Sequence, residues 1–227
     1  MTTRSVTTFA GGGTVSVDGI GTSAQIRLPM SIVVTPDGQS LLVHQTNEFT
    51  IRHIDISTKL VTIFCDQGLT SGNAWGLAVS PDGKKVLVAQ GSNLKMIDAT
   101  AATPRQAITL VGGSTVGNLD GVGTAALFQG LSSVVFDPTG DGSWALVGDR
   151  STVRVVELAS GKVTTIAGTL VGVLNGNAVG SGAQMRVNSI YGMAFSPDGL
   201  AVYLSDHNNR RIKRISLCRD KVRCFAH

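Results

Sequence analysis

The chain has 227 residues, of which 42% are hydrophobic and 15% charged, and its formal net charge is +4. So much apolar content excludes a disordered chain, and no apolar stretch reaches the ~18 residues that a membrane-spanning helix needs. The mild positive charge permits an acidic partner or nucleic acid without demanding one. The 28 glycines, together with many β-branched residues, favour short strands joined by tight turns.

The N-terminal residues hold no apolar run of signal-peptide length, which favours a cytoplasmic location. The chain has three cysteines, Cys65, Cys218 and Cys224, whose spacing fits neither a disulfide framework nor a zinc motif. We therefore expect reduced thiols. Cys218 and Cys224 flank a predicted hairpin turn, and whether they are bridged stays open.

One pattern recurs four times along the chain: an apolar run, a Pro-Asp-Gly or Pro-Thr-Gly turn, and a second apolar run. The prolines of these turns are Pro36, Pro81, Pro138 and Pro197. Their spacing of about 45 to 59 residues is the period of a β-propeller blade. In each copy a third and a fourth run follow, in which apolar and polar residues alternate. Every copy is therefore predicted to hold four short strands.

The predicted blades span residues 29–65, 74–111, 131–167 and 190–226, within a single repeat array. Their first and second strands are nearly continuous apolar runs, as is typical of strands packed on both faces. The alternation in the third and fourth strands is typical of positions nearer the rim. Residues 5–10 have the pattern of a fourth strand but precede the first blade, so we predict a spare outer strand there.

Two segments carry a family resemblance. Residues 206–212 read Asp-His-Asn-Asn-Arg-Arg-Ile and lead into a predicted third strand. An Asp-Gly connection at residues 18–29 recurs at 120–128 and, in worn form, at 177–186, whereas the second blade lacks it. Together these segments resemble the NHL-repeat β-propeller family.

The resemblance covers the whole chain and implies an all-β propeller of four four-stranded antiparallel blades. The signature Asp stands in the third and fourth blades, as Asp149 and Asp206, but the first two blades carry Gln45 and Gln90 instead. In blades of this family such residues cross-link strands and loops by hydrogen bonds, so we expect a structural role for them.

Four complete blades and a spare outer strand leave two interpretations of the ring. The chain forms an open arc or part of a longer propeller of about six blades, or it forms a four-bladed ring with a redundant strand at its seam. We favour the open or incompletely closed array. Its uncovered apolar faces would recruit a partner or a second copy of the chain.

The sequence holds no catalytic or phosphate-binding motif, and we expect no cofactor and no enzymatic activity. The four histidines do not recur at equivalent repeat positions, so no ring of metal ligands is predicted. A metal-dependent propeller lyase or hydrolase nevertheless stays open as one alternative.

The favoured function is a protein-interaction scaffold that presents variable loops on one face. A second alternative is an NHL module that binds single-stranded RNA, which would use basic residues and exposed aromatic rings. No contact with a membrane is expected. The candidate partner surface comprises Arg27, Trp75, Arg186, Tyr191, Arg210 and Arg211.

Overall fold

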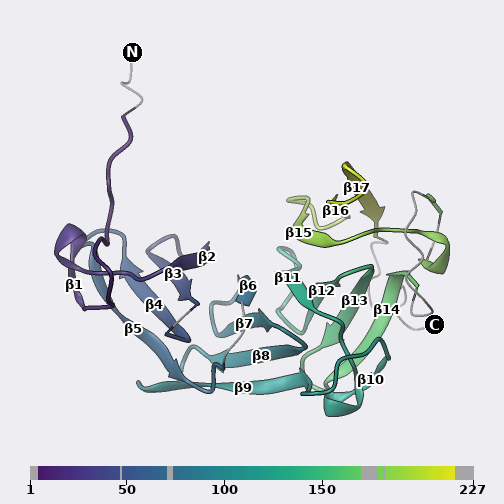
Figure 1. Cartoon of the computed structure of the whole chain (residues 1–227), viewed down its shortest axis with the longest axis horizontal. Helices are drawn as coiled ribbons and strands as arrows, with labels where there is room; N and C mark the ends of the chain where they lie inside the picture. The colour runs from purple at the N-terminus through teal and green to yellow at the C-terminus, as the bar shows by residue number, and fades with distance from the viewer. Residues whose placement is uncertain (1–4, 47, 71–73, 170–177, 181, 218–227) are drawn as a thin grey trace.

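The computed structural model describes residues 5–46, 48–70, 74–169, 178–180 and 182–217. The protein is all-β, and its strands form a curved, barrel-like array (Figure 1). Three short 3-10 turns are the helical elements within these ranges, and none of them is long or apolar enough to cross a membrane.

Four sheet units follow one another along the chain, each folded up and down in antiparallel order. The first unit holds β2 (Pro29–Val34), β3 (Ser40–Gln45), β4 (Thr50–Asp55) and β5 (Leu60–Gln67). The second holds β6 (Ala74–Val79), β7 (Lys85–Gln90), β8 (Asn93–Asp98) and β9 (Arg105–Gly112). The third holds β11 (Leu131–Phe136), β12 (Trp144–Asp149), β13 (Thr152–Glu157) and β14 (Lys162–Gly168), and the fourth holds β15 (Ile190–Phe195), β16 (Ala201–Asp206) and β17 (Arg211–Ser216).

The predicted Pro-Asp-Gly hairpins join the first two strands of a unit. In the first unit the Asp37 carboxylate accepts bonds from the Thr35 hydroxyl (2.6 Å) and the Gln39 amide (2.9 Å). These bonds stabilise the charged form and lower the pKa of Asp37. Gly38 has a φ of 70°, a backbone conformation that favours glycine. The second and fourth units repeat the arrangement with Asp82 and Asp198.

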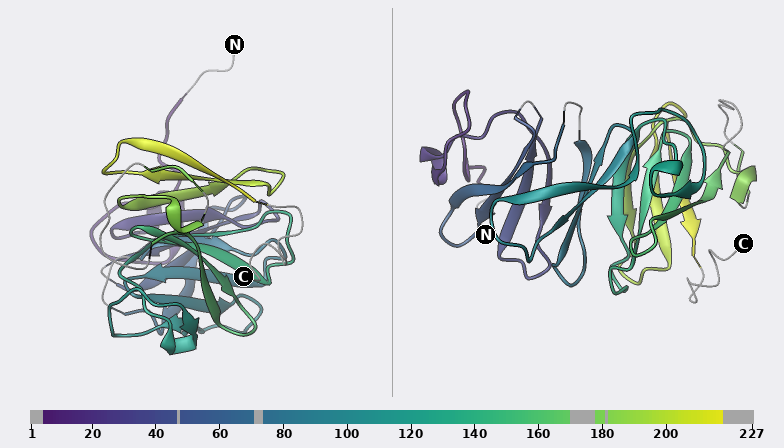
Figure 2. Two further views of the ribbon diagram at one scale, coloured as in Figure 1. Left: turned by 90° about the vertical axis from the view of Figure 1, so that its right-hand side faces the viewer. Right: turned by 90° about the horizontal axis from the view of Figure 1, so that it is seen from below.

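The four units lie side by side along a curve, with the first and fourth at its two ends (Figures 1 and 2). The first strands β2, β6, β11 and β15 contact one another in that order on the concave side. Hydrophobic clusters fill the spaces between successive units. In β7, Val86 and Val88 pack toward the first unit, whereas Leu87 and Ala89 pack toward the third. This packing on both faces explains the continuous apolar runs of the second strands.

The prediction of a strand at residues 5–10 was wrong: the described residues there form no strand. Val6 is fully exposed, and Gly11, which directly follows the segment, donates its amide to the Gly21 carbonyl (3.1 Å). A strand requires a partner edge. The third strand that would pair with this segment would belong to a unit preceding the first one.

The first two Asp-Gly connections instead each supply a short outermost strand that the sequence did not predict. β1 (Gly19–Ile20) pairs with β5, and β10 (Gly121–Val122) pairs with β14. The fourth strand predicted near residue 226, together with Cys218 and Cys224, lies outside the described residues. Cys65 is buried with a free thiol, and burial raises the pKa of this thiol.

Candidate binding site

The signature positions form buried ties inside each unit. Asp206 accepts bonds from the Asn188 amide (2.7 Å) and from the Asn209 side chain, and it pairs with Lys213 (3.1 Å). Asp149 accepts bonds from the amides of Gln129 (2.9 Å) and Gly130 (2.8 Å). Each carboxylate therefore joins the end of a second strand to the connection before the first strand.

Glutamine makes an equivalent tie where the signature Asp is replaced. The Gln45 side chain donates to the Arg27 carbonyl (2.9 Å) and to the Ser16 hydroxyl (2.6 Å). The Gln90 side chain donates to the Thr70 carbonyl (2.5 Å) and accepts a bond from the Thr70 amide (3.2 Å). Both side chains are buried. The residues at the signature positions therefore have a structural role, as the sequence predicted.

A buried cation occupies the third position of each third strand, and the Asp-Gly connections neutralise two of these cations. Arg154 pairs with Asp120 (2.8 Å) and donates to the Leu127 carbonyl (2.7 Å). Arg52 pairs with Asp18 in the same way. In the second unit, which lacks this connection, Lys95 reaches the Thr109 hydroxyl (3.3 Å).

Two residues of the predicted partner surface, Trp75 and Tyr191, come together at the edge of the arc where the first strands begin, here called the mouth. The rings of Trp75 and Tyr191 meet edge to face, with centroids 6.2 Å apart and planes at 85°. The side chains are 46% and 52% exposed. Tyr191 also contacts the His207 ring, with centroids 4.8 Å apart. Each aromatic residue is the second residue of a first strand. The strands β6 and β15 both contact β11, so the repeat brings the two rings together.

A cavity of about 290 Å³ lies beside these rings, which form part of its wall. Its walls also include Leu131, Ser132 and the exposed Arg150, whose φ of 46° places it in a tight turn. An apolar ring, a hydroxyl and a guanidinium beside one small cavity can hold a ligand by stacking and hydrogen bonding. The lining residues are Trp75, Gly91, Gly130, Leu131, Ser132, Arg150, Ser189, Ile190 and Tyr191.

The four predicted arginines do not line this cavity. Arg27 is exposed in the connection before β2. Arg186 is half-buried, and its guanidinium donates to the Met185 carbonyl (3.2 Å). Arg210 and Arg211 are exposed around the turn into β17. They lie within a few residues of His207, so the turn that touches Tyr191 also carries positive charge.

Arg150 was missed by the sequence reasoning, although its repeat position could have found it. It directly follows the signature residue Asp149, as His207 follows Asp206 and Gly91 follows Gln90. Because the signature tie fixes the end of the second strand, the next residue reaches the mouth. Gly91 and Arg150 line the cavity, and His207 touches its Tyr191 wall.

The opposite mouth is apolar. The four turn prolines converge there around a cavity of about 500 Å³ that they share with Val79, Val135, Phe136 and other apolar side chains. It offers no charged side chain to orient a ligand. Across the described parts of the chain, no group of three or more His, Cys, Asp or Glu side chains is placed to hold a metal ion.

Neither a protein-family model nor a curated protein matches this sequence. Solved structures do match its fold. An auxiliary nutrient binding protein from Bacteroides ovatus has 22% identity and a TM-score of 0.73, over 85% of this chain and 49% of that protein. One from Bacteroides thetaiotaomicron has 15% identity and a TM-score of 0.67, over 86% and 60%. The hydrazine synthase of Kuenenia stuttgartiensis has 15% identity and a TM-score of 0.55, over 83% and 46%.

These likenesses concern the fold alone, because identity is low. The chain spans about half to three fifths of the length of these proteins. Binding proteins and an enzyme both occur among them, so the shared fold does not decide the role of this chain.

Proposed function

We propose that the chain is a four-bladed array of NHL type that serves as a non-catalytic binding module. The ligand binds at the mouth around Trp75 and Tyr191, and the loops on this face of the array contact the partner. The observation that carries the proposal is the aromatic pair. Two large rings that are about half exposed to water lie beside a cavity, and a ligand that covered them would bury this apolar surface, which is favourable.

The cavity fits one small group rather than a large cofactor. Its volume of about 290 Å³ lies at the lower end of ligand pockets. A side chain or short loop of a partner protein has this size, and Arg150 would pair with an anionic neighbour on it. The binding role of the Bacteroides structural neighbours is compatible with this assignment.

Single-stranded RNA is a second candidate, and a specific observation favours it. Tyr191 and His207 form a tilted pair of exposed rings, and Arg210 and Arg211 follow in the same turn. Bases stack on such rings while arginines contact the phosphates. This ligand would bind more weakly as salt rises, since phosphate contacts release counterions.

Fluorescence of Trp75 tests the proposal directly. The chain has two tryptophans, so a Trp144→Phe background leaves Trp75 as the sole reporter. We expect a peptide library selected on the protein to yield ligands that quench or shift this signal. Trp75→Ala and Tyr191→Ala, followed by isothermal titration, should each weaken binding on the order of tenfold.

A matched pair of arginine variants separates the two candidates. Arg150→Gln should weaken peptide binding, whereas Arg27→Gln, which removes the same charge outside the cavity, should not. Equal losses in both variants, with a steep salt dependence and affinity for oligonucleotides, would favour RNA. Selected ligands that bind equally well without both aromatic rings would refute this mouth as the site.

A further inference from the structure

The interfaces between units follow one rule throughout the chain. Each unit has a leading face that packs against the preceding unit and a trailing face that packs against the next one. Between the first and second units, Val86 and Val88 of the leading face meet Leu42 and Ile51 of the trailing face. The same kind of interface recurs between the second and third units and between the third and fourth.

The leading face of the first unit, here called the head face, comprises Ile32, Val34, Leu41, Val43 and Ile54. Ile32 is 62% exposed and Val34 is 53% exposed. The residues at their repeat positions in the second unit, Leu77 and Val79, pack into the cluster between units.

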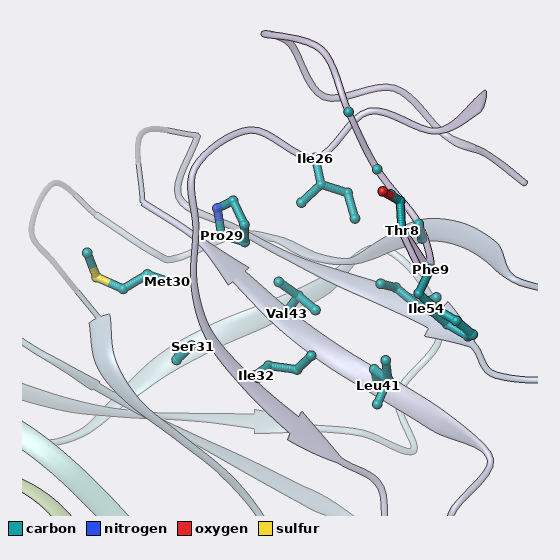
Figure 3. A pocket seen from close by; sticks show the side chains of 13 residues that line it. Thr8, Phe9, Ile26, Pro29, Met30, Ser31, Ile32, Leu41, Val43 and Ile54 are labelled. Atoms are coloured by element: carbon teal, nitrogen blue, oxygen red, sulfur yellow. The ribbon is translucent and has the colours of Figure 1, made fainter. Parts of the chain in front are cut away.

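An apolar cavity of about 450 Å³ opens on the head face, with Ile32, Leu41, Val43 and Ile54 along its floor and wall and Phe9 at its rim (Figure 3). Its lining is mainly apolar. Val43 and Ile54 are already buried against Ala24 and Val61, so a neighbouring sheet would chiefly bury the exposed Ile32 and Val34.

The trailing face of the fourth unit, here called the tail face, comprises Ala194, Tyr203, Ile212 and Arg214. Ile212 is 73% exposed, whereas its repeat equivalents Ile51, Leu94 and Val153 are fully buried. Tyr203 is exposed at the position where the first three units bury a leucine. The tail face thus offers the half of the interface that the head face lacks.

We infer that the head face of one copy of this chain binds the tail face of a second copy. The two faces lie at opposite ends of the arc (Figure 1), and each is one half of an interface that the chain already makes between its own units. A contact between unlike faces is heterologous, and two arcs that meet at both ends form a closed pair. Tyr203 offers a large ring at the leucine position of this interface, and Arg214 lies opposite it on the neighbouring strand.

The size of the 227-residue chain in solution tests this inference. Light scattering at up to about 100 µM, where interfaces of micromolar affinity are filled, should show a dimer or a larger head-to-tail assembly. Ile32→Glu on the head face and Ile212→Glu on the tail face should each give monomers, with folding checked by circular dichroism. Ile108→Glu changes an isoleucine of β9 that is also exposed but lies outside both faces, and it should leave the assembly intact.

Mixing the two monomeric variants distinguishes a head-to-tail contact from other arrangements. Ile32→Glu keeps its tail face and Ile212→Glu keeps its head face, so an equimolar mixture should form a dimer although each variant alone does not. Monomers of the unsubstituted chain would overturn the inference. Dimers that persist in either variant would overturn it as well, since they would join like faces or another surface.

Discussion

His44 should make folding stability depend on pH. Its side chain on β3 is fully buried, and neither ring nitrogen has a hydrogen-bond partner among the described residues. Burial disfavours the charged ring and lowers the pKa of His44 from 6.5 to about 4. Between about pH 6.5 and pH 4, His44 is therefore protonated in the unfolded chain but stays neutral in the folded one.

The sign and size follow from linkage. Because the pKa of His44 is lower in the folded state, its contribution to stability is present above pH 6.5 and is lost as pH falls toward 4. Each pH unit inside this window costs about 1.4 kcal/mol. Acidification from about pH 7 to about pH 5 should therefore remove about 2 kcal/mol of unfolding free energy through this residue.

Urea denaturation of the protein and of a His44→Ala variant measures the effect. Alanine stands at the equivalent position of the second unit, as Ala89, so the repeat accepts it. The variant should be less stable near neutral pH, because it leaves a cavity. The decisive quantity is the difference between the two pH slopes, which should be about 1.4 kcal/mol per unit in this window.

Substitution of an exposed histidine supplies the control. His207→Ala removes an exposed imidazole and leaves His44 in place, so a change of slope in His44→Ala that this variant does not share belongs to the buried ring. If His44→Ala also keeps that slope, the His44 ring accepts a proton in the folded state, and the assignment of its environment is wrong. Titration of the His44 ring by NMR would decide the same point.

Three further predictions concern the two carboxylates that pair with Arg154 and the glycine that ends β9. Burial raises the pKa of Asp149 to about 6, so the folded state takes up a proton as pH falls from about 7 to about 5 and gains about 1 kcal/mol of unfolding free energy. In urea titrations, Asp149→Asn should not show this gain. Asp120→Ala removes the nearer of the two carboxylates that pair with the buried Arg154 and leaves only Asp149, at 3.5 Å, so it should cost about 2 kcal/mol in the same assay. Gly112, at a φ of 86°, sits where an added Cβ would collide with a backbone carbonyl, so Gly112→Ala should lower the melting temperature several degrees more than Gly38→Ala, which has open space.

Much of the fold could be predicted because each unit repeats local signals. A Pro-Asp-Gly turn such as Pro36-Asp37-Gly38 determines a hairpin through its own hydrogen bonds, without help from distant residues. The prediction of a strand at residues 5–10 was wrong because a strand, unlike a turn, depends on a distant partner. Its apolar pattern permits a strand, but the pairing edge has to come from another part of the structure.

The candidate site was predictable only where it depends on repeat position. Trp75 and Tyr191 occupy equivalent positions, and the repeat brings such positions to one mouth. The prediction of the arginines rested on charge and, for Arg27 and Arg186, on equivalent loop positions, neither of which determines where a long side chain points. No sequence pattern indicated that the buried ring of His44 would lack hydrogen-bond partners among the described residues. That property depends on which side chains of the second unit pack against β3.

The arrangement of scaffold and mouth explains how an irregular array can carry a specific site. Asp149 and Asp206 bond to backbone amides, so they hold the ends of their strands whatever residue comes next. The next positions can then differ between units: Gly91 leaves space, Arg150 brings charge and His207 adds a ring. The polar groups at the mouth therefore gather on the third and fourth units. A ligand should lose more affinity from Arg150→Gln than from a substitution at any mouth position of the first two units apart from Trp75.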